Sequence, residues 1–190
     1  MSKKQVFIIA GPNGCGKTTF AKEFITEVNL PFLNADEIAA IKCPHNIEKA
    51  RIWGGKIFIN KIRDYIKKGK SFVIETTLSG KYLINYIKEF KKHNYKIMII
   101  YIFIESAEEA IYRIDIRVRK GGHFVIEKDV RRRFIRSKNN FWNIYRKSVD
   151  GWEIFLNHKD EFLQVAFGCK EEVNIISEFG FSIFMEGVDN

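Results

Sequence analysis

The segment from Gly11 to Thr18 combines glycines, a lysine and a hydroxyl at a spacing that suits phosphate binding. It reads Gly-Pro-Asn-Gly-Cys-Gly-Lys-Thr and satisfies the pattern G-x-x-x-x-G-K-[ST]. Glycines let successive backbone amides turn toward phosphate oxygens, and a helix starting at Lys17 directs its positive N-terminus at the same anion. The sequence therefore predicts a site for a nucleoside triphosphate, either ATP or GTP.

The polar side chains of this segment suggest how such a nucleotide is held. Lys17 is expected to reach the β- and γ-phosphates, and Thr18 to offer its hydroxyl to Mg²⁺. The amides around Cys15 are expected to favour its thiolate, although a small packing residue is the simpler interpretation. The predicted nucleotide-binding residues of this segment are Gly11, Pro12, Asn13, Gly14, Cys15, Gly16, Lys17, Thr18 and Thr19.

The rest of the chain alternates between strand and helix patterns. Short apolar runs typical of buried strands lie at 5–10, 31–34, 71–75 and 96–104. Helical periodicity marks 17–28, 48–68, 81–93, 106–120 and 127–147. Two strands follow at 152–157 and 162–167, with a third near 173–176 and a short helical turn. This order predicts an α/β sandwich with a mostly parallel sheet.

Length and composition limit the possible classes of protein. The 190 residues suit a single domain spanning 1–190, and no apolar run approaches the roughly 20 residues of a membrane span. Cys15, Cys43 and Cys169 form no CxxC pair, which argues against a disulfide framework or a zinc site. We expect a cytoplasmic protein without a membrane partner.

The net charge of +9 is concentrated in one stretch of the chain. Between Arg113 and Lys147 there are twelve Lys or Arg and three Asp or Glu, which accounts for the whole excess. Such a block is typical of a surface that meets anions, either the phosphates of a nucleotide or a nucleic-acid backbone. A solvated helix face is the alternative.

Acidic residues follow several of the predicted parallel strands, at the sheet edge where ligands bind in such folds. Asp36 could orient or deprotonate an acceptor hydroxyl, or could cap the next helix; Glu37 is the neighbouring alternative. Glu75 could help to hold Mg²⁺ through water and is the favoured acid, with Glu105 as another candidate and a solvated strand-end acid as the alternative.

Four ordered motifs resemble the zeta toxin family of P-loop kinases, in particular its short single-domain bacterial members. They are GPNGCGKTTFAKEF, FLNADEIAA, SFVIETTLSGK and RKGGHFVIEKDVRRRFIRSKNNF, and the resemblance runs from about Val6 to Phe167. It implies a kinase-type three-layer P-loop NTPase sandwich with about five strands and a small lid at about 113–133. It also implies transfer of the γ-phosphoryl group of ATP to a hydroxyl of a small acceptor, for which UDP-N-acetylglucosamine is one candidate.

The resemblance assigns roles to individual residues. Asp36 matches the family's catalytic base, while Glu75 and Thr77 match residues that line the acceptor pocket. Arg117 matches a phosphate-contacting arginine and is expected to act in catalysis together with Lys17 and Asp36.

The lid is expected to add further phosphate contacts. Arg113 lies four residues before Arg117 and shares its helix face, so it is also expected to bind nucleotide. His123 replaces a second family arginine, and Gly121 and Gly122 supply a hinge beside it. Ile126 stands where the family often has proline, which is expected to loosen this loop. Among Arg131, Arg132, Arg133 and Arg136, one or two are expected to face the nucleotide.

The sequence alone leaves three functions open. A small-molecule kinase is the leading hypothesis, with an antitoxin protein as a further partner that the resemblance suggests. A nucleic-acid-directed P-loop ATPase or polynucleotide kinase is the alternative, resting on the basic block and its aromatic residues. A nucleotide-dependent switch with little transferase activity is the third.

Overall fold

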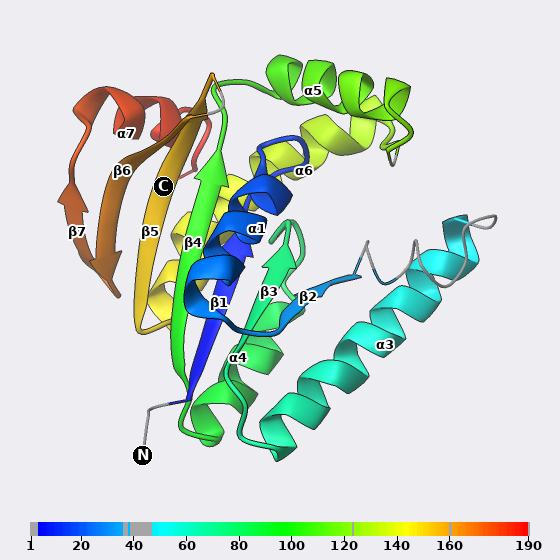
Figure 1. The fold of residues 1–190 in the computed structure, drawn as a ribbon. Helices are drawn as coiled ribbons and strands as arrows, with labels where there is room; N and C mark the ends of the chain where they lie inside the picture. The colour runs from blue at the N-terminus through cyan, green and yellow to red at the C-terminus, as the bar shows by residue number, and fades with distance from the viewer. Residues whose placement is uncertain (1–3, 36–37, 39–46, 123, 160, 190) are drawn as a thin grey trace.

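The computed structural model describes residues 4–35, 38, 47–122, 124–159 and 161–189, which form an α/β structure (Figure 1). Its strands are β1 Gln5–Ala10, β2 Phe32–Asn34, β3 Phe72–Thr76, β4 Lys96–Phe103, β5 Gly151–His158, β6 Glu161–Cys169 and β7 Glu172–Ile175. Its α-helices are α1 Lys17–Val28, α3 Ile47–Lys67, α4 Leu83–Lys92, α5 Ala107–Arg119, α6 Glu127–Asn140 and α7 Glu178–Met185. Within these residues no helix combines the length and the apolar character needed to cross a membrane.

The described strands form one sheet in the order β2-β3-β1-β4-β5-β6-β7. The first five are mutually parallel, whereas β6 and β7 are antiparallel to their neighbours. The mostly parallel sheet was predicted correctly, but the expected count of about five strands was too low. The hairpin β5–β6 and the strand β7 continue the same sheet beyond its parallel part.

Two apolar clusters fill the space on either side of the sheet. One contains buried residues of α3, α4 and α7, and the other contains buried residues of α1 and α5. Figure 1 shows α1 lying across the face of β1 and β4, with α3 and α4 on the other side. This three-layer arrangement brings the carboxyl ends of the parallel strands to one edge, beneath α5 and the N-terminal half of α6 (Figure 1).

The register of the central strands fixes where the glycine-rich segment begins. Ala10, the last residue of β1, lies opposite Thr76 on β3 and Tyr101 on β4. Gly11 therefore leaves the sheet between these two strands. The side chains that end β3 are level with the start of this segment, while residues after Phe103 lie further along the strand direction.

The helix predicted over 127–147 is interrupted. The α-helix ends at Asn140, a π-helical turn covers Phe141–Tyr145, and a 3₁₀ turn covers Arg146–Ser148. Phe141 and Tyr145 are fully buried, and Phe141 stacks on Tyr101 with 4.4 Å between ring centroids. The π-helical turn occurs where these aromatic rings pack against the sheet. The hydrophobic periodicity of the sequence could not reveal such a turn.

Glu153 on β5 gives the fold a testable pH dependence. Burial raises the pKa of its carboxyl above the ordinary 4.5, although Gln164 donates a hydrogen bond to it at 3.1 Å. A raised folded-state pKa means that the folded protein holds this proton longer, so the group's contribution to stability falls as the pH rises above 4.5.

We expect Glu153→Gln to remove this loss while keeping a partner for Gln164. Chemical denaturation should show the free energy of unfolding of the variant rising relative to the wild type from pH 4 to pH 7. Solvent screening of this half-buried group keeps the gain to at most about 0.5 kcal/mol. Glu161→Gln, an exposed change on β6, controls for loss of one negative charge. A Glu153→Gln advantage that stays constant across this range would contradict the interpretation.

Candidate active site

The P-loop, residues 11–18, follows β1 and packs tightly against neighbouring elements. Gly16 has φ 91° and caps the N-terminus of α1; a Cβ there would collide with the amide of Asn157 on β5. A Cβ on Gly14 would lie 2.7 Å from Ala110 O on α5. Glycine is required at both positions because the loop backbone must approach β5 and α5 closely.

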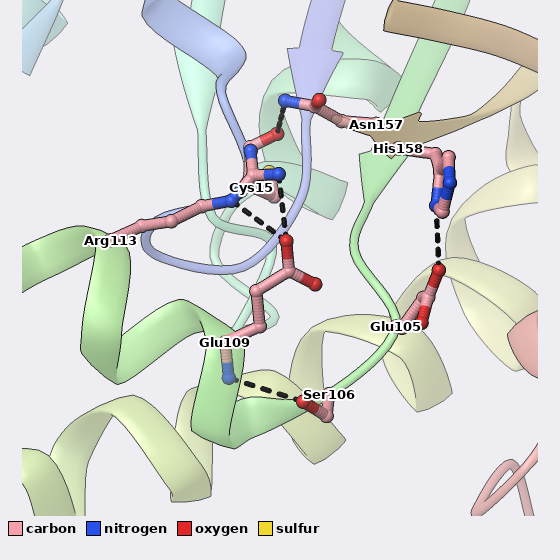
Figure 2. A network of polar contacts seen from close by, with 7 residues as sticks. All are labelled: Cys15, Glu105, Ser106, Glu109, Arg113, Asn157 and His158. Atoms are coloured by element: carbon pink, nitrogen blue, oxygen red, sulfur yellow. Dashed lines mark hydrogen bonds and ion pairs between the residues drawn. The ribbon is translucent and has the colours of Figure 1, made fainter. Parts of the chain in front are cut away.

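Asn157 holds the loop from behind. Its Nδ2 donates to Cys15 O at 3.1 Å, and its side chain is 2% exposed (Figure 2). The carbonyl of Cys15 is thereby turned toward β5. A buried amide at this point of β5 had no signal in the sequence, since one asparagine at a strand end is common.

Lys17 and Cys15 lie inside the loop. Lys17 Nζ donates to Pro12 O at 2.7 Å and is 3.9 Å from Cys15 Sγ. Burial raises the pKa of the Cys15 thiol, and the nearby Lys17 only partly offsets that effect. The expectation of a thiolate was therefore wrong, and Cys15 is a small packing residue of the second cluster.

Thr18 and Glu75 meet across the start of α1 and the end of β3. The Thr18 hydroxyl lies 3.1 Å and 3.0 Å from the two carboxylate oxygens of Glu75, to which it donates. Glu105, the other candidate acid, instead pairs with His158 Nδ1 at 2.8 Å. Glu105 is four residues beyond Tyr101 and lies past the end of β4 at Phe103.

This pair fits a magnesium ion. Mg²⁺ in nucleotide sites takes one or two protein oxygens and completes its shell with phosphate and water. Thr18 Oγ1 and the Glu75 carboxylate are hard oxygen donors at one point of the cleft, directly after Lys17. The described residues contain no group of three His, Cys, Asp or Glu that could hold a metal by themselves.

Helix α5 contributes two arginines to the same cleft. The cleft has a volume of about 360 Å³, and Arg113 and Arg117 line it together with Lys17, Thr18, Glu75 and Thr77. Glu109 accepts from the Arg113 guanidinium at 2.7 Å and steers it toward the P-loop (Figure 2). Ser106 begins the helix by accepting from Glu109 N at 3.1 Å, as the capping pattern predicted.

A third arginine reaches the P-loop from α6. Arg133 Nη1 lies 3.5 Å from Asn13 Oδ1, and its other contact is a loose ion pair with Asp129 at 3.8 Å. Its neighbours Arg131 and Arg132 are exposed and pair with acids of α5 and α6. Sequence reasoning placed Arg133 only within a group of four arginines and left it out of the predicted site.

The predicted residues on the acceptor side are described in part. Asn34 ends β2 level with Glu75 and lines the cleft, and Thr77 Oγ1 lies 2.9 Å from Ser79 Oγ. Asp36 and Glu37 lie outside the described residues, two and three positions past Asn34. His123 likewise lies outside them.

A second groove of about 980 Å³ adjoins the P-loop between α5 and the β5–β6 hairpin. Gly14, Gly16 and Arg113 line it on the loop side, and Tyr112 and Phe162 supply apolar walls. The Glu105–His158 pair stands at its rim (Figure 2). The His158 side chain is 44% exposed beside this groove, which continues from the phosphate cleft.

The glycine-rich loop after β1, the parallel sheet and the converging arginines define a P-loop protein of the kinase fold. The family model described as zeta toxin matches residues 1–161, and the chain belongs to this family. An uncharacterised protein of Haemophilus influenzae is 34% identical over 134 residues, covering 70% of this chain and 94% of its own length. Family and fold together support a kinase-type phosphotransferase.

Solved structures share the fold at low sequence identity. The AvrRxo1-ORF1:ORF2 complex with ATP contains a chain with TM-score 0.72 and 18% identity, matching 95% of this chain and 63% of that one. The PezAT toxin-antitoxin system of Streptococcus pneumoniae gives TM-score 0.72 and 14% identity, with 99% and 79% covered. The chain thus spans less than two thirds of the matched chain in the AvrRxo1-ORF1:ORF2 complex.

The Thr18–Glu75 pair yields a prediction with an internal control. Glu75→Gln can still accept from Thr18 but loses the negative charge that attracts a divalent cation. We expect the gain in ATP affinity on adding Mg²⁺ to fall about tenfold, measured by calorimetric titration with and without Mg²⁺.

Glu105→Gln is the matched control because it neutralises the other acid that follows a parallel strand. It should leave the magnesium dependence within about twofold of the wild type. If Glu105→Gln lowers the magnesium dependence about tenfold and Glu75→Gln leaves it unchanged, the metal site lies at Glu105 and not at Glu75.

Proposed function

We propose that this protein transfers the γ-phosphoryl group of ATP to a hydroxyl of a small acceptor, with a UDP-sugar such as UDP-N-acetylglucosamine as the acceptor class. The observation that carries the proposal is the cleft in which Lys17, Thr18 and Glu75 face Arg113 and Arg117. Cations and a metal-binding pair at one end of a triphosphate are what phosphoryl transfer requires.

Different side chains of the cleft stabilise the charge of different phosphates. Lys17 leaves Pro12 O and binds the β- and γ-phosphates, which supply stronger, charged acceptors. Arg117 and Arg133 approach the outer phosphate from α5 and α6, where negative charge spreads in the transition state. Thr18 and Glu75 would hold Mg²⁺, which would supply positive charge against the phosphates.

The acceptor approaches from the side of β2 and β3. Asn34 is level with Glu75 and lines the cleft. Asp36 follows it by two residues in the sequence and is the residue that the family resemblance matches to the catalytic base. In this proposal the Asp36 carboxylate orients the acceptor hydroxyl and takes its proton as that oxygen bonds to the γ-phosphorus. The bond from the γ-phosphorus to the β–γ bridging oxygen breaks, and ADP leaves. Thr77 offers a hydroxyl to the same acceptor at the end of β3.

The groove between α5 and the β5–β6 hairpin suits the nucleoside of ATP. It joins the phosphate cleft at Gly14 and Gly16 and offers apolar walls from Tyr112, Ile116 and Phe162. The acceptor and the nucleoside thereby occupy opposite sides of the P-loop.

An antitoxin protein is also proposed as a partner, as the family resemblance suggests, because PezAT and AvrRxo1-ORF1:ORF2 are complexes.

The contacts made by the basic block, residues 113–147, favour a small-molecule kinase over a nucleic-acid-binding protein. Among the described residues, at least eight of its twelve cations contact acids or backbone carbonyls: Arg113, Arg119, Arg131, Arg132, Arg133, Lys138, Arg146 and Lys147. Phe134, Phe141 and Tyr145 are buried and cannot stack on bases. The block is largely a set of paired helix faces.

The test is product analysis. We expect incubation with ATP·Mg²⁺ and a panel of UDP-sugars to yield a sugar nucleotide carrying one added phosphate, detected by mass. Asp36→Asn should lower the transfer rate on the order of 10²-fold or more, because the hydroxyl loses its base.

Two results would count against the proposal. Unchanged transfer by Asp36→Asn would remove the assigned base. Release of free phosphate without any modified sugar nucleotide would instead favour the nucleotide-dependent switch. Lys22→Gln, an exposed charge change on α1, is the control that should leave transfer unaffected.

A further inference from the structure

The loop after β3, residues 77–80, is hydrogen-bonded to the segment 137–145, which consists of the last residues of α6 and the π-helical turn. We name it the acceptor loop because Thr77 is its first residue. Three side chains of that segment donate hydrogen bonds to three of its four carbonyls. The bonds are Ser137 Oγ to Thr77 O at 2.5 Å, Asn140 Nδ2 to Leu78 O at 2.8 Å and Tyr145 OH to Gly80 O at 2.7 Å.

The acceptor loop holds a backbone conformation that needs such support. Leu78 has φ 52°, the left-handed region that a branched, bulky residue rarely adopts, and its side chain is 1% exposed. A conformation of this kind costs roughly 1–3 kcal/mol and persists where its surroundings over-determine it. Here the surroundings are the buried side chain and the hydrogen bonds to the three carbonyls.

The π-helical turn is what aims two of these donors at one target. Asn140 and Tyr145 are five residues apart, and in an α-helix they would point about 140° away from each other. A π-helix closes its hydrogen bonds from residue i to i+5, so residues five apart point in much more similar directions than in an α-helix. Arg146 N donates to Phe141 O in this pattern. The wider turn therefore lets both side chains reach the acceptor loop.

The segment that carries the donors is itself anchored. Tyr101 OH on β4 donates to Ser137 Oγ at 2.8 Å, and the ring of Phe141 stacks on that of Tyr101. On the far side, Lys138 Nζ donates to Ile183 O and Glu186 O at the end of α7. The donors thus project from a part of the molecule that is fixed from two directions.

We propose that Asn140 and Tyr145 are positioning residues that set the acceptor loop, and through it Thr77, for the incoming acceptor. They act through carbonyls and lie outside the lining of the phosphate cleft. The assignment of the loop to the acceptor rests on the proposed function. The hydrogen bonds that hold the loop do not depend on the proposed function, so the positioning role and the choice of acceptor can be disproved separately.

The first arm of the test measures the loop itself. Tyr145→Phe and Asn140→Leu each remove one donor, and Tyr95→Phe is the matched control. Tyr95 OH donates to Tyr65 O and Lys70 O, so its loss removes a tyrosine hydrogen bond away from the loop. We expect amide hydrogen exchange in the peptide spanning 77–82 to quicken about five- to tenfold in both variants. Exchange in 11–18 should stay unchanged, and Tyr95→Phe should alter neither peptide.

The second arm separates positioning from a general loss of structure. With UDP-N-acetylglucosamine as probe, Tyr145→Phe should raise its KM about five- to tenfold while the KM for ATP stays within twofold. A fall in kcat with both KM values unchanged would contradict the proposal, as would unchanged exchange at 77–82. If the wild type leaves UDP-N-acetylglucosamine unmodified, the acceptor class is wrong, and the exchange arm still decides whether these residues set the loop.

Discussion

The close approach of the P-loop backbone to its neighbours is the constraint on which the rest of the site depends. Gly16 lies against Asn157 on β5, and Gly14 lies against Ala110 on α5. Because neither has a side chain, one strand and one helix can meet at the same eight-residue loop. The position of α5 relative to the loop decides where Arg113 and Arg117 point, so backbone packing governs the electrostatics of the cleft.

Strand register adds the second half of this arrangement. β1 lies between β3 and β4, and the last residue of β1 is level with Thr76. The carboxylate of Glu75 therefore meets the hydroxyl of Thr18, the second residue of a helix that begins at Lys17. A negative group beside a loop built to hold phosphates would repel the ligand unless a cation stands between them. This is the physical reason to place Mg²⁺ at the Thr18–Glu75 pair.

Much of this could be predicted from the sequence because local patterns determined it. The P-loop motif, the parallel strands and the Ser106 cap each depend on residues close together in the chain. The zeta toxin motifs likewise pointed to the family that the family comparison shows. The sequence favoured Glu75 over Glu105, but both stand near the ends of apolar strands, and the strand register is what separates their positions.

The remaining differences arise from packing between distant segments. Arg133 could not be told from Arg131 and Arg132, since consecutive helical residues point about 100° apart and the sequence does not fix the rotation of α6. The π-helical turn depends on Phe141 fitting against Tyr101, forty residues earlier. Burial raises the pKa of the Cys15 thiol, and a glycine-rich loop gives no sign of that burial in the sequence.

A crystal structure with a non-hydrolysable ATP analogue and Mg²⁺ tests the central claim most directly. The account predicts a metal about 2.1 Å from Thr18 Oγ1, with Glu75 in its first or second shell. It also predicts a γ-phosphate bounded by Lys17 and the arginines of α5 and α6. A metal beside Glu105 and His158, or a triphosphate bound away from residues 11–18, would contradict it.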